Sequence, residues 1–242
     1  MNLILTPTQS DIFKVLGDFL TQILPSSVTI LQAQENRIPE PSTPDFVLMN
    51  STFRSRLSTN VDEYLDCLFT GSIAGTTLTV TAVAFGNIIK GAPIFGAGIA
   101  ANTSVVNFIS GTGGAGTYQI TPTQTVASET MAAGVANLKQ PTEVVIQLDV
   151  HGPNGGDNMQ IISTAFRDGY AVDFFTAANP AISPLYADDG KQIPFINAEQ
   201  QFENRWILEA YIQADQAITN IPQQFAGTLK VGIINVEATY PS

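Results

Sequence analysis

The chain has 242 residues, of which 44% are hydrophobic and only 13% are charged. This charged fraction is about half of what soluble globular proteins usually carry. Ten basic against 21 acidic side chains give a net charge of −11, which excludes tight, static binding to nucleic acid because that binding needs Lys and Arg on the phosphates. The single cysteine excludes an internal disulfide. The low charge indicates a surface that other subunits partly cover.

The N-terminal sequence MNLILTPTQSD lacks the basic start and the long apolar run of a secretory signal, so we expect none. The most apolar window is GAPIFGAGIAANTSVVNFI, at residues 91–109. Its glycine, proline and asparagine content predicts short strands and turns rather than a membrane span.

The first predicted element is a helix that Ser10 caps and Pro25 ends. Its apolar side chains recur at helical spacing, which predicts one buried face: Ile12, Phe13, Leu16, Phe19, Leu20 and Ile23. Strands are predicted at about residues 28–34 and 46–57, on either side of a proline-rich loop.

Residues 67–134 differ in composition from the rest of the chain. Lys90 and Glu129 are the only charged side chains between Cys67 and Gly134, and Gly, Thr, Ala and Val dominate. Alternation at residues 77–81 and closely spaced glycines predict a small all-β module rather than a disordered segment.

After this segment, alternating Val144, Ile146, Leu148 and Val150 predict a strand with one apolar face. A helix follows, for which Asp157 and Gln160 form a capping-box pattern; its apolar side chains are Met159, Ile162 and Phe166. Strands are expected near residues 205–215 and 229–238.

This order predicts an α+β host domain at residues 1–66 and 135–242, with a mixed or antiparallel sheet and two packed helices. The segment at 67–134 is then an inserted, β-rich decoration module. In the strand near residue 205, alternation places Trp206, Leu208, Ala210 and Ile212 in the host core and Arg205, Ile207, Glu209 and Tyr211 on the opposite face.

Few residues are suited to catalysis. One His and one Cys cannot form a tetrahedral zinc site, and no G-x-S-x-G sequence is present. His151 stands in VHGPNGGD and is expected to be a turn or surface histidine. This turn lacks the Gly-Lys-Ser/Thr ending of a phosphate loop, and Asp157 would repel an anion there. We therefore predict no catalytic, cofactor or metal site.

The acidic clusters are Asp62, Glu63 and Asp66, and the pair Asp188 and Asp189. Asp-Asp-Gly is typical of a turn, and DDGKQIP does not place oxygen ligands at the alternating positions of a calcium loop. A hydrolase that uses two of these carboxylates stays open as an alternative.

The long stretch PLYADDGKQIPFINAEQQFENRW, with its continuation ILEAYIQADQAITNIPQQFAGTLKVGIINVEATYP and the preceding GGDNMQIISTAFRDGYAVDFF, resembles the phage neck and tail-terminator-like family. The shared pattern is PLYAD, QxPF, a glutamine-rich run that ends in Arg-Trp, and a late Pro-Gln-x-Phe. GGDNMQIISTAFRDGYAVDFF looks like the central helix of that family. The segment 67–134 resembles Gly/Thr-rich modules of phage tail proteins.

The resemblance implies a non-enzymatic virion protein of the tail or neck, assembled in the bacterial cytoplasm without a cofactor. Such subunits form a homomeric, usually six-fold, ring that caps the tail tube, ends tail polymerisation and docks the head-completion or connector protein. The tail tube, and the sheath where one exists, would be partners, and DNA would pass through the lumen without specific binding. An adhesive or glycan-binding virion protein is the alternative, and paired exposed aromatics in residues 67–134 would be its mark.

The loop that starts at Pro184 contains the residues that we expect at an assembly interface, with its acids meeting Arg54, Arg56 or Lys191 of a neighbour. Pro184, Gly190 and Pro194 favour a rigid path, for which a buried Tyr186 would be one apolar anchor. The candidate interface residues are Leu185, Tyr186, Asp188, Asp189, Lys191, Phe195 and Arg205.

Overall fold

The computed structural model describes residues 3–33, 43–193, 195–196 and 202–222. The chain folds into two compact units. Unit 1 consists of Met1–Asp62 and Leu138–Thr219, and unit 2 of Glu63–Asn137 and Asn220–Ser242. Each unit has a hydrophobic core of its own, so each is described by itself.

Helix α1 (Gln9–Ile23) begins at a capping box. The Thr8 hydroxyl accepts a hydrogen bond from the Asp11 amide at 3.2 Å, and the Asp11 carboxylate accepts one from the Thr8 amide at 2.7 Å. The prediction that Ser10 is the cap is therefore wrong by two residues, because Thr8 and not Ser10 has Asp11 three positions later. The helix ends before Pro25 as predicted.

The segment GGDNMQIISTAFRDGYAVDFF contains two helices, α2 (Gly155–Phe166) and α3 (Gly169–Ala178). Asp168 separates them, since its carboxylate caps α3 by accepting a hydrogen bond from the Tyr170 amide at 2.9 Å. The prediction that Asp157 caps α2 is wrong: Asn154 is the N-cap residue, and Asp157 lies inside the first turn.

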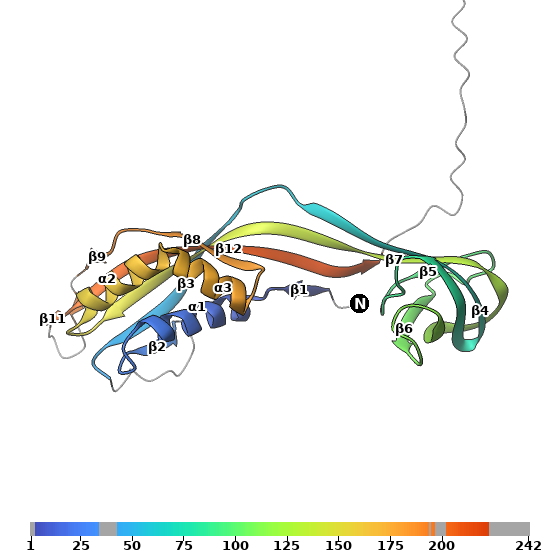
Figure 1. The fold of residues 1–242 in the computed structure, drawn as a ribbon, viewed down its shortest axis with the longest axis horizontal. Coiled ribbons are helices and arrows are strands. Elements are labelled where there is room, and N and C mark those ends of the chain that lie inside the picture. The colour runs from blue at the N-terminus through green and yellow to red at the C-terminus, as the bar shows by residue number, and fades with distance from the viewer. Residues whose placement is uncertain (1–2, 34–42, 194, 197–201, 223–242) are drawn as a thin grey trace, which may run out of the picture. The chain divides into compact units, whose positions relative to one another are not determined.

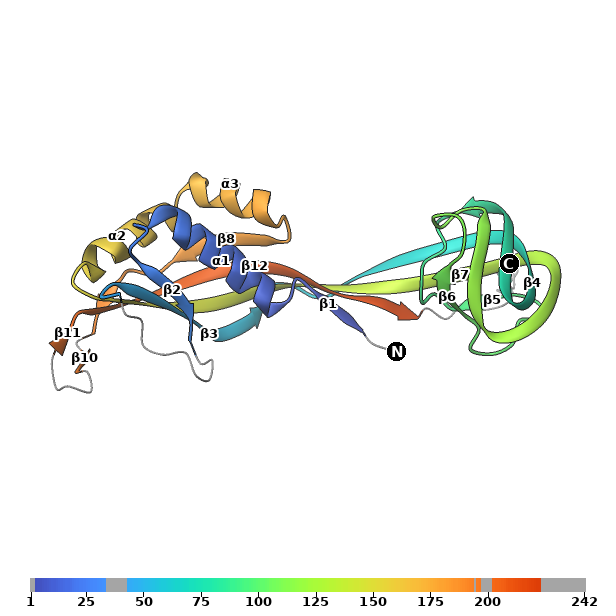
Figure 2. The same cartoon turned by 90° about the horizontal axis from the view of Figure 1, so that it is seen from below.

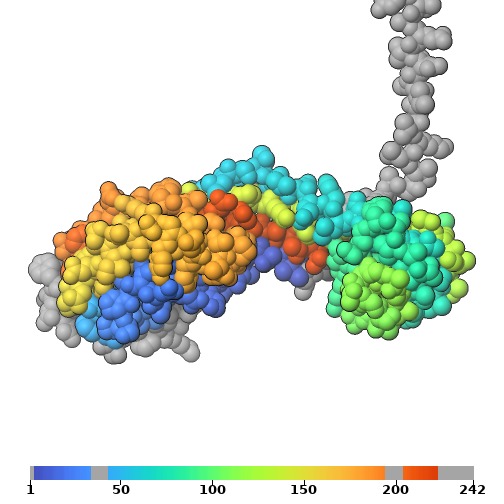
Figure 3. All heavy atoms as spheres, viewed as in Figure 1, coloured from blue at the N-terminus to red at the C-terminus, as the bar shows by residue number. Residues whose placement is uncertain are grey.

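Unit 1 is therefore a sheet with three helices in its described part, where two were predicted. Figures 1 and 2 show these helices on one face of the sheet, and in Figure 3 the atoms of α2 and α3 (yellow to orange) lie beside those of α1 (blue). Phe19 of α1 joins them: its ring centroid lies 6.1 Å from that of Phe166 in α2 and 5.6 Å from that of Phe175 in α3.

The sheet has the strand order β1-β12-β7-β3-β2. The bounds are Ile4–Thr6 for β1, Arg205–Pro222 for β12, Gly116–His151 for β7, Phe46–Arg56 for β3 and Thr29–Gln32 for β2. Strands β8 (Ile182–Ala187) and β9 (Lys191–Gln192) also pair with β12, and β10 (Phe195–Ile196) pairs separately with β11 (Phe202–Glu203). Strand β2 runs parallel to β3, and β3 runs antiparallel to β7, so the sheet is mixed. The predicted strand at 229–238 lies outside the described residues.

The helices cover the sheet face to which alternate side chains point, as the spacing predicts. The buried strand residues of this core are Val47, Met49, Val144, Ile146, Leu148, Val150, Ile182, Ala187, Leu208, Ala210, Ile212 and Ala214. The intervening side chains of β3, β7 and β12 point to the opposite face, which is called the open face below.

The described part of unit 2 consists of strands and loops: β4 (Val61–Phe85), β5 (Ile94–Phe95), β6 (Ser104–Phe108), the first part of β7 and the end of β12. The first three of these strands each pair with β7. The core consists of the buried side chains Cys67, Phe69, Ile73, Leu78, Val80, Ile88, Ala92, Ile94, Val105, Tyr118, Ile120, Val126, Met131, Ala133 and Val135. That this region is an inserted domain that folds by itself stays a prediction.

No helix among the described residues is both long and apolar enough to cross a membrane.

Candidate functional surfaces

The glycines of VHGPNGGD have structural roles. Gly152 has φ of +106°, and a Cβ atom there would clash with the Pro44 carbonyl oxygen, so the turn requires glycine. Asp45 holds the next residues, because its two carboxylate oxygens accept hydrogen bonds from the Asn154 amide at 2.9 Å and the Asn154 side chain at 2.8 Å. An acidic group thus occupies the turn, where a phosphate loop would need a cationic side chain.

His151 ends β7 and is 7% exposed. Its ring stacks on Phe46, with centroids 4.5 Å apart and an interplanar angle of 8°. The prediction of a turn or surface histidine is therefore wrong, because the residue still belongs to the paired strand. Within the described ranges, no group of three or more His, Cys, Asp or Glu side chains could hold a metal ion.

Trp206 lies over the first turn of α2. A Cβ atom at Gly155 would lie 3.4 Å from Trp206 Cδ1, and one at Gly156 would lie 3.4 Å from Trp206 Nε1. These glycines leave room for the indole, which packs against the unit 1 core but is only partly buried. Trp206 thus faces the core as predicted, although it is less deeply buried than Leu208 or Ile212.

The two aspartates of the predicted interface differ in their contacts. Asp189 is paired with Arg167 of its own chain at 3.0 Å, so the prediction that it meets a cation of a neighbour is replaced by an internal pair. Arg167 also donates to the Ala187 carbonyl at 2.9 and 2.6 Å, which fixes the end of β8. The Asp188 amide donates to the Glu209 carbonyl at 2.9 Å, and its partly exposed side chain lies beside β12.

Three further residues of the predicted assembly interface do not lie together. Arg205 forms an ion pair with Asp149 at 3.1 Å, and both side chains are mostly buried, so Arg205 ties β12 to β7 instead of facing a partner. Lys191 is exposed on β9, in register with Ile207. The side chain of Phe195 lies outside the described part of the chain.

Tyr186 and Tyr211 stack on each other across β8 and β12. Their ring centroids are 4.1 Å apart with an interplanar angle of 13°. The Tyr211 hydroxyl donates to the Glu209 carboxylate at 3.0 Å, and this hydrogen bond raises the pKa of Tyr211 to about 12. Tyr186 is 47% exposed, so the prediction of a buried anchor is wrong.

Acidic side chains surround this stack. Partial burial raises the pKa of Tyr186, and the nearby charges of Glu143 and Asp188 raise it further. Phe53 lies on the same side of the sheet, because it pairs with Val145, which points away from the helix-covered core. Phe53 is 60% exposed.

Together these side chains form the tyrosine patch of the open face: Phe53, Glu143, Tyr186, Asp188, Glu209 and Tyr211. Sequence alternation correctly assigns Glu209 and Tyr211 to the face opposite the core. Sequence alternation does not identify Phe53 and Glu143 as part of this patch. The strand order and a β-bulge between Ser51 and Phe53 decide which side chains meet in the tyrosine patch.

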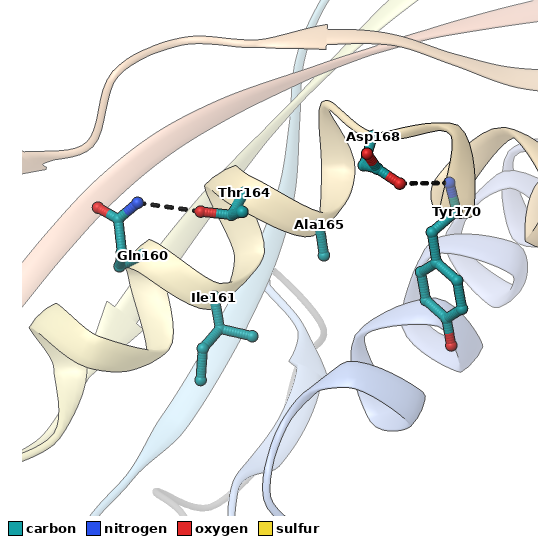
Figure 4. A pocket seen from close by; sticks show the side chains of 6 residues that line it. All are labelled: Gln160, Ile161, Thr164, Ala165, Asp168 and Tyr170. Atoms are coloured by element: carbon teal, nitrogen blue, oxygen red, sulfur yellow. Dashed lines mark hydrogen bonds between the residues drawn. The ribbon is translucent and has the colours of Figure 1, made fainter.

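The helical side of unit 1 has a hollow of about 490 Å³. Figure 4 shows Ile161, Ala165 and Tyr170 pointing to the same side of α2 and α3. The other lining residues are Gln160, Thr164 and Asp168. Their polar groups bond locally, Gln160 to Thr164 at 3.0 Å and Asp168 to the Tyr170 amide at 2.9 Å. The hollow therefore offers an apolar contact surface rather than a reactive group.

The aromatic residues of unit 2 are divided between core and surface. Phe69 and Tyr118 are buried, whereas Phe85 is 55% and Phe108 36% exposed. The Phe108 ring packs edge-on against Tyr118, with centroids 5.2 Å apart. One ring of this contact is thus in the core, and the glycan-binding alternative stays without specific support.

Comparison with known proteins gives one family. No curated protein matches the chain. The family model of the phage neck terminator protein matches residues 104–239, which is more than half of the 242 residues. The match includes the PLYAD-to-Arg-Trp stretch that carries the resemblance, and it begins within residues 67–134, so it does not separate the predicted insert from the host. The chain belongs to the phage neck terminator protein family.

Proposed function

We propose that this structural protein of the phage neck is a tail terminator whose copies form a ring. The ring would cap the tail tube, end tail polymerisation and dock the head-side connector. The observation that carries the proposal is the family match. The low charged fraction of 13% supports it, because a subunit covered on several sides needs fewer charged side chains.

A closed ring requires two different surfaces on each subunit, one for each neighbour. Unit 1 has two separate apolar surfaces. One is the edge strand β1 with the residue before it: Leu3, Ile4 and Leu5 are 57%, 53% and 44% exposed. The other is the helix-side hollow, where Ile161 and Tyr170 are 38% and 45% exposed. In the proposed ring, β1 of one copy lies on the hollow of the next.

The tyrosine patch and the end of β8 are assigned to the contact with the tube or the connector. Leu185, Tyr186, Asp188 and Lys191 stay candidates there, because their side chains are wholly or partly exposed. Asp189 and Arg205 are already paired within the chain. The net charge of −11 suits a ring through which DNA passes without being bound.

The ring contact can be tested by light scattering and negative-stain electron microscopy at high protein concentration. Ile161→Lys should prevent rings, because it places a charge in the hollow. Val172→Lys is the matched control, since Val172 is 46% exposed on α3 and does not line the hollow. Rings of unchanged size in Ile161→Lys would disprove this contact.

The tube or connector contact can be tested separately with tail tubes added to the purified protein. Asp188→Lys should form rings that no longer cap the tube, whereas Asp173→Lys, a change on the exposed side of α3, should cap normally. A wild-type protein that stays monomeric and never caps a tube would contradict the proposed function and favour the adhesive alternative.

A further inference from the structure

We infer that the tyrosine patch binds an arginine-bearing, basic face of a protein different from this chain. This inference deepens the proposed function, on which it rests for the site of docking, because it gives the chemistry of the docking partner. Three properties of the patch carry it: an exposed aromatic surface, carboxylates with unused acceptor capacity, and the charge balance of the chain.

The aromatic surface is already organised. Tyr186 and Tyr211 stack at 4.1 Å, so the ring of Tyr186 is held in place by its partner while 47% of the residue stays exposed. A guanidinium group stacks on such a ring more readily than other polar groups, since it is planar, cationic and weakly hydrated. Exposed Phe53 adds apolar area on the same face.

The carboxylates supply the second half of the recognition. Glu209 accepts one hydrogen bond from the Tyr211 hydroxyl, and Glu143 accepts one from the Ser55 hydroxyl at 3.0 Å. A carboxylate has about four acceptor sites, so both can also accept the paired N–H donors of an arginine. Asp188 lies close enough to influence the pKa of Tyr186.

Another copy of this chain is a poor source of that arginine. Among the described arginines, Arg54 donates to Gln216 at 3.1 Å, and Arg167 and Arg205 form the ion pairs with Asp189 and Asp149. The fourth, Arg56, faces the side-chain amide of Gln140, with Nε 2.8 Å from it. Each copy also carries a net charge of −11, so an acidic patch repels a second copy at long range. Nucleic acid is repelled for the same reason.

The experiment uses the full chain and two synthetic peptides of equal length, one an Arg-Gly repeat and the other the same repeat with citrulline, which is neutral. Calorimetry at low salt should show the arginine peptide binding about tenfold more tightly, the size expected for a stacked and paired guanidinium. Equal binding of both peptides would overturn the inference.

Variants locate the binding. Tyr186→Ala and Glu209→Gln should each weaken the arginine peptide about fivefold to tenfold, since each removes one part of the recognition. Tyr64→Ala and Asp173→Asn are the controls: Tyr64 is 59% exposed on β4, and Asp173→Asn changes the net charge as Glu209→Gln does. Unchanged affinity in both patch variants would overturn the inference, as would tighter binding of duplex DNA than of the arginine peptide.

The outcome is separable from that of the proposed ring. Peptide binding is measured on the wild type and on Ile161→Lys, whose change lies on the helical side. If Ile161→Lys still forms rings, the proposed contact between β1 and the hollow is wrong, while the measured binding of the arginine peptide to the tyrosine patch is unaffected. If rings are lost as expected but the arginine peptide binds no better than citrulline, only the inferred partner chemistry fails.

Discussion

The two units achieve burial in different ways. In unit 1, three helices cover one face of a mixed sheet and leave the other face with exposed aromatics and carboxylates. In unit 2, the described core comes from strands and loops without a helix, and residues 67–134 contribute only Lys90 and Glu129 as charged side chains. The comparison teaches that the charged groups able to recognise a partner concentrate in unit 1, whereas exposed aromatic side chains occur in both units, such as Tyr186 in unit 1 and Phe85 in unit 2. Apart from such aromatics, unit 2 offers mainly backbone, hydroxyl and small apolar groups.

The sharpest test of this division is to truncate one large buried side chain in each core and to measure the two variants separately. Phe19→Ala in unit 1 and Phe69→Ala in unit 2 should each cost about 3–5 kcal/mol, the usual range for a fully buried Phe; the two side chains are 0% and 1% exposed. If the units unfold independently, differential scanning calorimetry will show each variant lowering one transition and leaving the other in place. A single transition lowered equally by both would mean that the units unfold together.

A smaller effect is expected at Trp206. Sequence periodicity alone predicts about 3–5 kcal/mol for Trp206→Ala, but the side chain is only partly buried, so we expect about 2 kcal/mol. Urea unfolding followed by circular dichroism measures it.

Trp206→Phe provides the control for the indole N–H. Among the described residues no acceptor reaches Trp206 Nε1, so removing the N–H should cost less than about 1 kcal/mol. A larger loss would show that this group has a partner that matters for stability.

The sequence predicted local structure well where short-range chemistry decides it. The apolar spacing of α1 and the alternation in β7 and β12 identify buried side chains such as Leu16, Ile146 and Leu208, because one face of each element must enter the core. The errors lie at boundaries. Thr8 and Ser10 are both able to cap a helix, and only the Thr8–Asp11 spacing completes the capping box.

The candidate site was less predictable, because it depends on which strands become neighbours. Tyr186 and Tyr211 are far apart in sequence and meet only through the β8–β12 register. Asp189 was expected to meet another subunit, but the break between α2 and α3 brings Arg167 to it. Nothing in the periodicity of a single element specifies such contacts between elements.

Removing residues 63–137, the first segment of unit 2, tests whether the contrast in composition is also a division in folding. Glu63 and Asn137, the two ends of this segment, lie side by side: the Asn137 side-chain amide donates to the Glu63 carboxylate at 3.3 Å. A short glycine linker from Asp62 to Leu138 should therefore leave unit 1 folded, with a loss of about 1 kcal/mol or less from the altered connection. Loss of cooperative melting in the deletion variant would contradict the prediction of a separable module.

The smallest effect at neutral pH concerns Cys67, which is 1% exposed in the unit 2 core. Burial raises the pKa of its thiol from 9.0 to about 11, because the apolar core disfavours the thiolate. A raised pKa means that the stabilisation is complete below pH 9.0 and is lost as the pH rises through about 11. The thermal stability of unit 2 should thus decrease in that alkaline window, and it should decrease less in Cys67→Ala.

The burial of Cys67 also predicts slow reaction of the folded protein with a thiol reagent and fast reaction after unfolding. Rapid labelling of the native chain would show that the unit 2 core around Cys67 opens readily in the folded protein.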